Sequence, residues 1–213
     1  MTHGDMQAQV HKNINYKEIS ILLMKIISSS FNKFQNSKST VHQFIIVGIS
    51  AAFLLLVPLA AMQFTDEVAW SLFDFFAAWL LLFGTGITYL LITRQMNNTA
   101  YKTAVGIAAA TTLLIVWANL SVGIIGSENN PANFMYLGAI AVEIIGTIIA
   151  RFRAHGMSIA MFATAFANAL VLVIALSINL SDEINESIMI LIPNILFIGL
   201  WIFSALLFRK AKR

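Results

Sequence analysis

The sequence predicts an all-α integral membrane protein, a bundle of six transmembrane helices. Of its 213 residues, 59% are hydrophobic and 11% are charged, whereas soluble domains carry about 25% charged residues. A chain with so few charges could not cover a surface that faces water, so most of its surface must face lipid. The apolar runs are continuous rather than alternating at every second residue, which argues against a transmembrane β-barrel.

Six apolar runs are long enough to cross the hydrocarbon core, which takes about 20 residues per crossing. They cover residues 43–63, 69–93, 103–125, 133–151, 157–179 and 187–208. Short connections with turn-forming or charged residues separate them, so neighbouring helices must be antiparallel. A basic tail, residues 1–42, precedes the first run, and a basic end, residues 209–213, follows the last.

The basic residues predict how the helices are oriented. All 13 Lys and Arg residues fall on one side of the six-helix arrangement, in the tail, the second and fourth connections and the C-terminal end. The other connections contain acidic residues and no basic ones. Because short loops rich in Lys and Arg stay in the cytoplasm, we expect both termini to be cytoplasmic.

The tail contains a possible surface helix. Apolar residues recur at helical spacing over residues 16–34, with Lys17, Lys25 and Lys33 beside them. A basic amphipathic helix of this kind lies in the membrane interface against anionic lipid. Membrane lipid is therefore the expected partner of the tail, and a partly disordered tail is the alternative. Nucleic acid is not expected, because the basic tail lies beside a membrane, where anionic lipid is the nearer partner.

Two acidic residues lie within the predicted spans, Asp74 and Glu143. A carboxylate inside the bilayer is costly unless it is paired, protonated or hydrated. At a rise of about 1.5 Å per residue, Glu143 lies near the midplane of the fourth span and Asn168 at a similar depth in the fifth. We expect these two side chains to meet, with a neutral Glu143 donating a hydrogen bond to Asn168 or to a nearby carbonyl.

A second polar layer is expected closer to the outer surface. Asp74, Asn119 and Asn194 lie at matched depths of about 8–10 Å below the outer ends of their helices. Small and hydroxyl residues recur at spacings of three and four around Asn119, Glu143 and Asn168, which indicates that these faces contact other helices. These five residues form the candidate intramembrane polar site, although single Asn residues also serve simply to join helices.

No motif in the sequence names a reaction. There is no cysteine, and neither a nucleophile elbow nor a phosphate-binding loop occurs. All four histidines lie outside the spans, which argues against haem or zinc bound between the helices. We therefore expect no cofactor and no metal, and an enzyme is the least favoured class.

Several stretches of the chain resemble a family of small multi-pass membrane proteins of bacteria. They begin at Met62-Gln63-Phe64-Thr65-Asp66-Glu67 and include Phe73-Asp74-Phe75, residues 117–128, Asn130-Pro131-Ala132-Asn133 and Ala150-Arg151-Phe152-Arg153. The likeness covers residues 55–178 and is most specific in the third span and the loop that follows it. It implies a location in the bacterial inner membrane and carries over no activity, substrate or catalytic residue.

Two functions remain open on these grounds. One is a small transport or channel-like protein that moves a proton, an ion or a small solute, with Glu143 as the binding group. The other is a non-catalytic membrane component that packs against a partner protein or another copy of itself. The abundance of small residues favours the second, and a carboxyl near the midplane favours the first.

Overall fold

The computed structural model describes residues 21, 24–25, 28, 41–64, 70–94, 96–127, 129–178 and 184–211. Within these ranges six helices are long and apolar enough to span a membrane. They are Val41–Phe64, Leu72–Thr93, Thr99–Ser121, Pro131–Ile149, Ala154–Ile178 and Ser187–Ala211. No strand occurs in the same ranges. The predicted all-α fold with six membrane-spanning helices is confirmed, and the chain is a multi-pass membrane protein.

The chain divides into two compact units, residues 1–56 and 57–213. In the first unit, residues 41–54 are helical. Most of the predicted surface helix at residues 16–34 lies outside the described residues. The second unit contains every residue of the candidate polar site.

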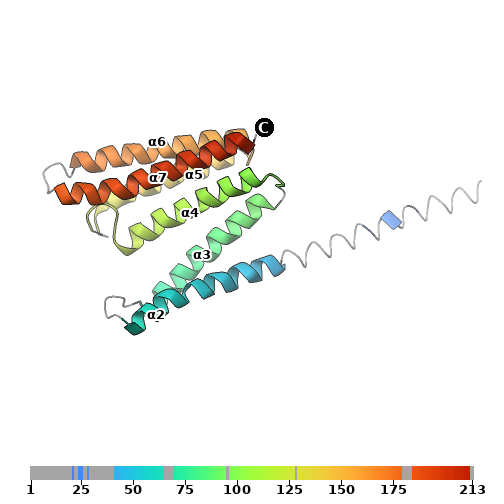
Figure 1. Cartoon of the computed structure of the whole chain (residues 1–213), viewed down its shortest axis with the longest axis horizontal. Helices are drawn as coiled ribbons and strands as arrows, with labels where there is room; N and C mark the ends of the chain where they lie inside the picture. Colours follow the sequence, from blue (N-terminus) through green and yellow to red (C-terminus); the bar gives the residue numbers. More distant parts are fainter. Residues whose placement is uncertain are drawn as a thin grey trace, which may run out of the picture. The chain divides into compact units, whose positions relative to one another are not determined.

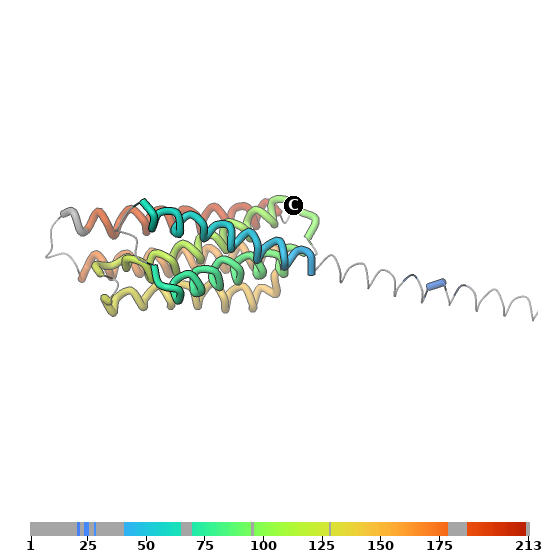
Figure 2. Tube along the Cα trace, turned by 90° about the horizontal axis from the view of Figure 1, so that it is seen from below, coloured from blue at the N-terminus to red at the C-terminus, as the bar shows by residue number. Residues whose placement is uncertain are grey.

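The second unit contains most of α2, the helices α3 to α7 and one short 3-10 helix, which appear in Figures 1 and 2. The helices are α2 (Leu56–Phe64), α3 (Leu72–Thr93), α4 (Thr99–Ser121), the 3-10 helix η1 (Pro131–Phe134), α5 (Met135–Ile149), α6 (Ala154–Ile178) and α7 (Ile184–Ala211). α3 packs on α4, α4 on α7, α7 on α6, and α6 on α5. α3 and α5 are the two ends of this series, and each packs extensively on one neighbouring helix.

The core of this unit is formed mainly by α4, α6 and α7. The largest fully buried apolar side chains include Ile115, Met161, Trp201 and Phe208. Large apolar side chains are exposed on every spanning helix, as Leu72 and Ile149 illustrate. Side chains of this kind are compatible with lipid tails and not with water. Most large apolar residues of the spans therefore face lipid and do not pack inside the unit.

Small residues let α5 and α6 approach closely. A Cβ atom added to Gly146 would lie 2.8 Å from the Cβ atom of Ala160. Separations this short are reached only where one of the two residues lacks a side chain, as in the small-residue contacts of membrane helices. Glycine at 146 therefore sets the distance between the two helices.

The third span ends earlier than the apolar pattern predicts, at Ser121 rather than near residue 125. Gly123 follows with a φ of 73°, a left-handed conformation that glycine adopts without steric cost. The backbone N–H groups of Ile124 and Ile125 then donate to the Asn133 side chain, at 3.1 and 2.9 Å. This loop after α4 is thus folded around a buried asparagine.

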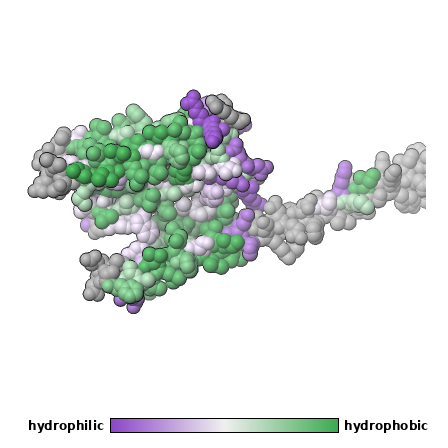
Figure 3. Space-filling view, in the orientation of Figure 1, coloured by the Kyte–Doolittle hydropathy of each residue, from purple (hydrophilic) through white to green (hydrophobic). Residues whose placement is uncertain are grey.

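The basic segments of the second unit meet at one end. The Asn98 amide, at the start of α4, donates to the Ala211 carbonyl at the end of α7. The Tyr101 hydroxyl donates to the Phe152 carbonyl in the turn between α5 and α6 at 2.6 Å. Exposed basic residues lie in the segments joined in this way, namely Arg94, Arg151, Arg153, Arg209 and Lys210. Figure 3 shows the hydrophilic surface gathered at the end where the chain finishes.

Candidate functional site

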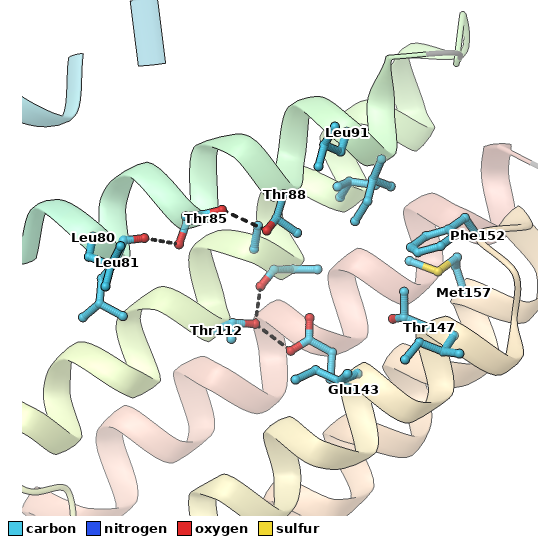
Figure 4. A pocket seen from close by; sticks show the side chains of 17 residues that line it. Leu80, Leu81, Thr85, Thr88, Leu91, Thr112, Glu143, Thr147, Phe152 and Met157 are labelled. Carbon is cyan, nitrogen blue, oxygen red and sulfur yellow. Dashed lines mark hydrogen bonds between the residues drawn. The ribbon is translucent and has the colours of Figure 1, made fainter. Parts of the chain in front are cut away.

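A cavity of about 550 Å³ lies among α3, α4 and α5. Its size is typical of small-molecule sites, which run from about 300 to 1,000 Å³. Most of its wall is aliphatic, and its polar lining consists of one carboxyl and four hydroxyl side chains. These are Glu143, Thr85, Thr88, Thr112 and Thr147. Figure 4 shows Glu143 and Thr112 facing each other from α5 and α4, with Thr85 and Thr88 on α3.

Among the described residues, the Glu143 carboxyl takes part in one hydrogen bond. The Thr112 hydroxyl oxygen lies 2.7 Å from Glu143 Oε2 and 3.0 Å from the carbonyl oxygen of Ala108. No other hydrogen bond to this carboxyl occurs within the described part of the chain, and the residue is only half-buried. One carboxyl oxygen is therefore free to bind something in the cavity.

Thr112 can stabilise both protonation states of Glu143, because a hydroxyl has one proton to donate and two lone pairs. When the carboxyl is ionised, Thr112 donates to it. When the carboxyl is protonated, Glu143 donates to Thr112, whose proton turns to the Ala108 carbonyl. Both arrangements use the same positions of the heavy atoms, so gaining or losing a proton requires no movement of the helices.

The threonines of α3 present acceptors to the cavity. Thr85 donates its hydroxyl proton to the Leu81 carbonyl at 2.7 Å, and Thr88 donates to the Gly84 carbonyl at 2.8 Å. Each hydroxyl oxygen keeps lone pairs that can accept a hydrogen bond from a ligand. The Thr147 hydroxyl makes no hydrogen bond with any described residue and can donate or accept.

The expected contact between Glu143 and Asn168 is wrong. The Asn168 amide nitrogen donates to Asn194 Oδ1 at 3.3 Å, so Asn168 faces α7, whereas Glu143 faces α4. Glu143 and Asn168 lie at similar depths when positions are counted along the predicted spans. Two neighbouring helices, however, share only a narrow strip of their surfaces. Matching depth therefore does not determine which helix a side chain meets.

Asn168 belongs to a closed cluster with Asn194 and Tyr136. The Asn194 amide nitrogen donates to the Tyr136 hydroxyl and to the Ile190 carbonyl, both at 2.8 Å. All three side chains of the cluster are essentially inaccessible. Asn168 Oδ1 is the one atom of the cluster that lacks a hydrogen-bond partner among the described residues. This cluster joins α5, α6 and α7 and has no opening through which a ligand could enter.

The predicted outer layer of Asp74, Asn119 and Asn194 is not formed. Asp74 is exposed, and its carboxylate accepts from the backbone N–H and the hydroxyl of Ser71, at 2.7 and 2.8 Å. This is a capping box at the start of α3. The prediction that Asp74 faces the bundle is therefore wrong. The sequence contains the signal for its real role, since Ser-x-x-Asp before an apolar run marks a helix start.

Asn119 also acts locally. Its amide nitrogen donates to the Ile115 carbonyl of its own helix at 2.8 Å, and its Oδ1 atom is buried with no partner among the described residues. Of the three residues expected in the outer layer, Asn194 alone joins different helices. It does so through the closed cluster rather than through the other two.

Several residues of the cavity were not selected from the sequence. Thr112 and Thr147 belong to the small and hydroxyl residues predicted to face other helices, but the sequence assigns no binding role to them or to Thr85 and Thr88. A usable signal exists in the spacing of Thr85 and Thr88, which places two hydroxyls on one face of an otherwise aliphatic helix. Tyr136 of the closed cluster also received no polar role, because an aromatic ring in a span resembles ordinary packing.

The described residues hold no group of three His, Cys, Asp or Glu side chains that could bind a metal ion. Comparison with protein-family models, with curated proteins and with solved structures finds no match to this chain. The cavity and its lining residues are therefore the features of this chain that indicate a function.

Proposed function

We propose that the protein is a small transport or channel-like protein of the bacterial inner membrane that moves a proton, an ion or a small solute. The observation that carries this proposal is the half-buried carboxyl of Glu143, which lies inside a span and opens into the cavity. A carboxyl with no function would be expected to be enclosed by hydrogen-bond partners, as the Asn194 side chain is. Glu143 is instead accessible and has one hydrogen-bond partner.

The position of the cavity also supports transport. Its lining runs from Leu80 and Glu143, which lie well inside their helices, to Ile92 and Phe152 beside the basic end of the unit. We propose that this end is cytoplasmic, because basic residues are retained on that side of the membrane. The cavity would then connect the level of Glu143 with the cytoplasmic side.

The test is proton flux in liposomes that contain the purified protein, a pH-sensitive dye and an imposed potassium diffusion potential. The wild type is expected to carry flux, and Glu143→Gln is expected to abolish it, because the amide cannot exchange a proton. Asp74→Asn is the matched control, since it removes an acidic charge that lies outside the cavity. Wild-type flux from a folded Glu143→Gln variant would contradict the proposal.

The alternative is the non-catalytic membrane component that packs against a partner or another copy. A folded wild-type protein that carries neither protons nor any offered solute would favour that alternative. A pull-down of membrane partners and a measurement of oligomeric state in nanodiscs would then be the informative experiments.

A further inference from the structure

We propose that the cavity binds an organic ammonium ion with an apolar body. Its N–H groups would donate to Glu143 and to the threonine hydroxyl oxygens on α3. Its hydrocarbon part would lie against the apolar side chains at the end of the cavity that contains Leu91, Phe152 and Met157. This inference rests on the proposed function, because it names the class of small solute that uses the same carboxyl. Three properties of the cavity support it, namely charge, hydrogen-bonding character and volume.

The charge of the lining selects a cation. Of the described residues around the cavity, Glu143 is the one that can be charged, and no Lys, Arg or His is among them. An anionic solute would enter a site of low dielectric without a counter-charge, which is strongly unfavourable. A cation would form an ion pair with the ionised carboxylate instead.

The hydrogen-bonding groups select a donor. Thr85 and Thr88 have already donated their protons to carbonyls of their own helix, so each can only accept from a ligand while that bond persists. The ionised Glu143 is also an acceptor. An ammonium group with several N–H donors matches these acceptors, whereas a carbonyl-rich solute would find Thr147 as its main donor.

The volume and the aliphatic wall select an organic ion. One water molecule takes up about 30 Å³ in the liquid, and the cavity has a volume of about 550 Å³. A bare alkali ion or a proton would therefore leave most of the cavity unused. Figure 4 shows Leu91, Phe152 and Met157 grouped at the end of the cavity away from Leu80 and Leu81. A hydrocarbon chain could bury its surface against that group while its ammonium reaches Glu143. The aromatic ring of Phe152 would add apolar contact area.

The test is equilibrium dialysis of the purified, full-length protein in nanodiscs against octylammonium, with 1-octanol and octanoate as probes of the same chain length. We expect octylammonium to bind with one Glu143-dependent equivalent. Glu143→Gln should weaken this binding by at least about tenfold, since a charge-assisted hydrogen bond is lost. Empty nanodiscs correct for partition into lipid, and Asp74→Asn serves as the control for loss of an acidic charge.

The pH dependence provides an independent readout. A proton and an ammonium ion compete for the same carboxyl, so wild-type affinity for octylammonium should rise with pH until the carboxyl is fully ionised. The affinity of Glu143→Gln should not change with pH in this way. Thr88→Val, which removes an acceptor but leaves the carboxyl, should weaken octylammonium binding by a few-fold and leave 1-octanol unaffected.

Two results would overturn the inference. One is equal affinity of the wild type for octylammonium and 1-octanol, which would show that the cavity only accommodates apolar chains. The other is unchanged octylammonium affinity in folded Glu143→Gln and Thr88→Val. Dialysis involves no gradient, so proton flux that depends on Glu143 without ammonium binding would overturn this inference and leave the transport proposal standing. Binding without flux of protons or octylammonium would support the ligand class and contradict transport.

Discussion

The closed cluster of Asn168, Asn194 and Tyr136 and the cavity around Glu143 both place polar groups between membrane helices, but they are built differently. In the closed cluster, hydrogen bonds join three helices and the side chains are inaccessible. In the cavity, the Glu143 carboxyl has one hydrogen-bond partner among the described residues, and its other oxygen remains open. The first arrangement holds helices together, and the second leaves a group available to a ligand.

The comparison shows that the presence of a polar residue inside a span is not sufficient evidence of function. Such residues are tolerated when neighbouring helices satisfy them, and their contribution is then to stability. A functional group is recognised by an accessible atom that the protein itself leaves unsatisfied. The following four predictions test this difference, from the largest expected effect to the smallest.

The largest effect is expected at the open carboxyl. Glu143→Gln should reduce proton flux by at least about tenfold, which corresponds to about 1.4 kcal/mol in the barrier. Its free energy of unfolding, measured by SDS titration, should stay close to that of the wild type, because the amide keeps the hydrogen bond to Thr112. A large loss of stability with normal flux per folded molecule would assign Glu143 to the same class as the buried asparagines.

The reverse pattern is expected in the closed cluster. Asn194→Leu leaves the Tyr136 hydroxyl and the Asn168 amide without their partner, so the free energy of unfolding should fall by about 2–3 kcal/mol. Flux per folded molecule should be retained. Asn119→Leu is the matched control and should change stability by less than about 1 kcal/mol, since Asn119 bonds within its own helix. Equal costs for the two substitutions would contradict the assigned role of the cluster.

The contact between α5 and α6 should be sensitive to a single methyl group. Gly146→Ala places a Cβ atom 2.8 Å from that of Ala160, so the helices must separate at a cost of about 1–2 kcal/mol. Gly138→Ala on the same helix meets nothing within 4 Å and should be neutral or slightly stabilising. The comparison is measured by SDS titration of both variants, and a neutral Gly146→Ala would show that the two helices do not pack this closely.

The smallest effect is expected at the surface. Asp74→Ala removes one half of the capping box at the start of α3, so amide hydrogen exchange should accelerate in the first turn of that helix. Neither flux nor octylammonium binding should change. Loss of either activity would mean that Asp74 acts beyond the helix terminus.

The helices were predictable from the sequence because hydropathy over about 20 residues reports the thickness of the bilayer directly. The end of α4 was not, since Gly123 and the side chain of Asn133 stop the helix inside an apolar run. The sequence indicates Glu143 as a site residue because an acidic residue in a span is rare. It does not indicate Thr112, because threonine is common in membrane helices. Which helix each polar side chain faces depends on packing between segments far apart in the chain, and hydropathy does not contain that information.

The turn between α5 and α6 has a practical consequence for engineering this protein. Arg151 and Phe152 both adopt left-handed conformations, with φ of 48° and 57°, each disfavoured for a residue with a side chain by about 1 kcal/mol. The Tyr101 hydroxyl of α4 donates a hydrogen bond to the Phe152 carbonyl in this turn. The Phe152 side chain also forms part of the cavity wall. The length of the turn is therefore constrained by this hydrogen bond and by the cavity that Phe152 lines. A fluorescent reporter, an epitope or a single inserted residue placed here would distort the cavity, so labels for topology or transport assays belong at other positions in the chain.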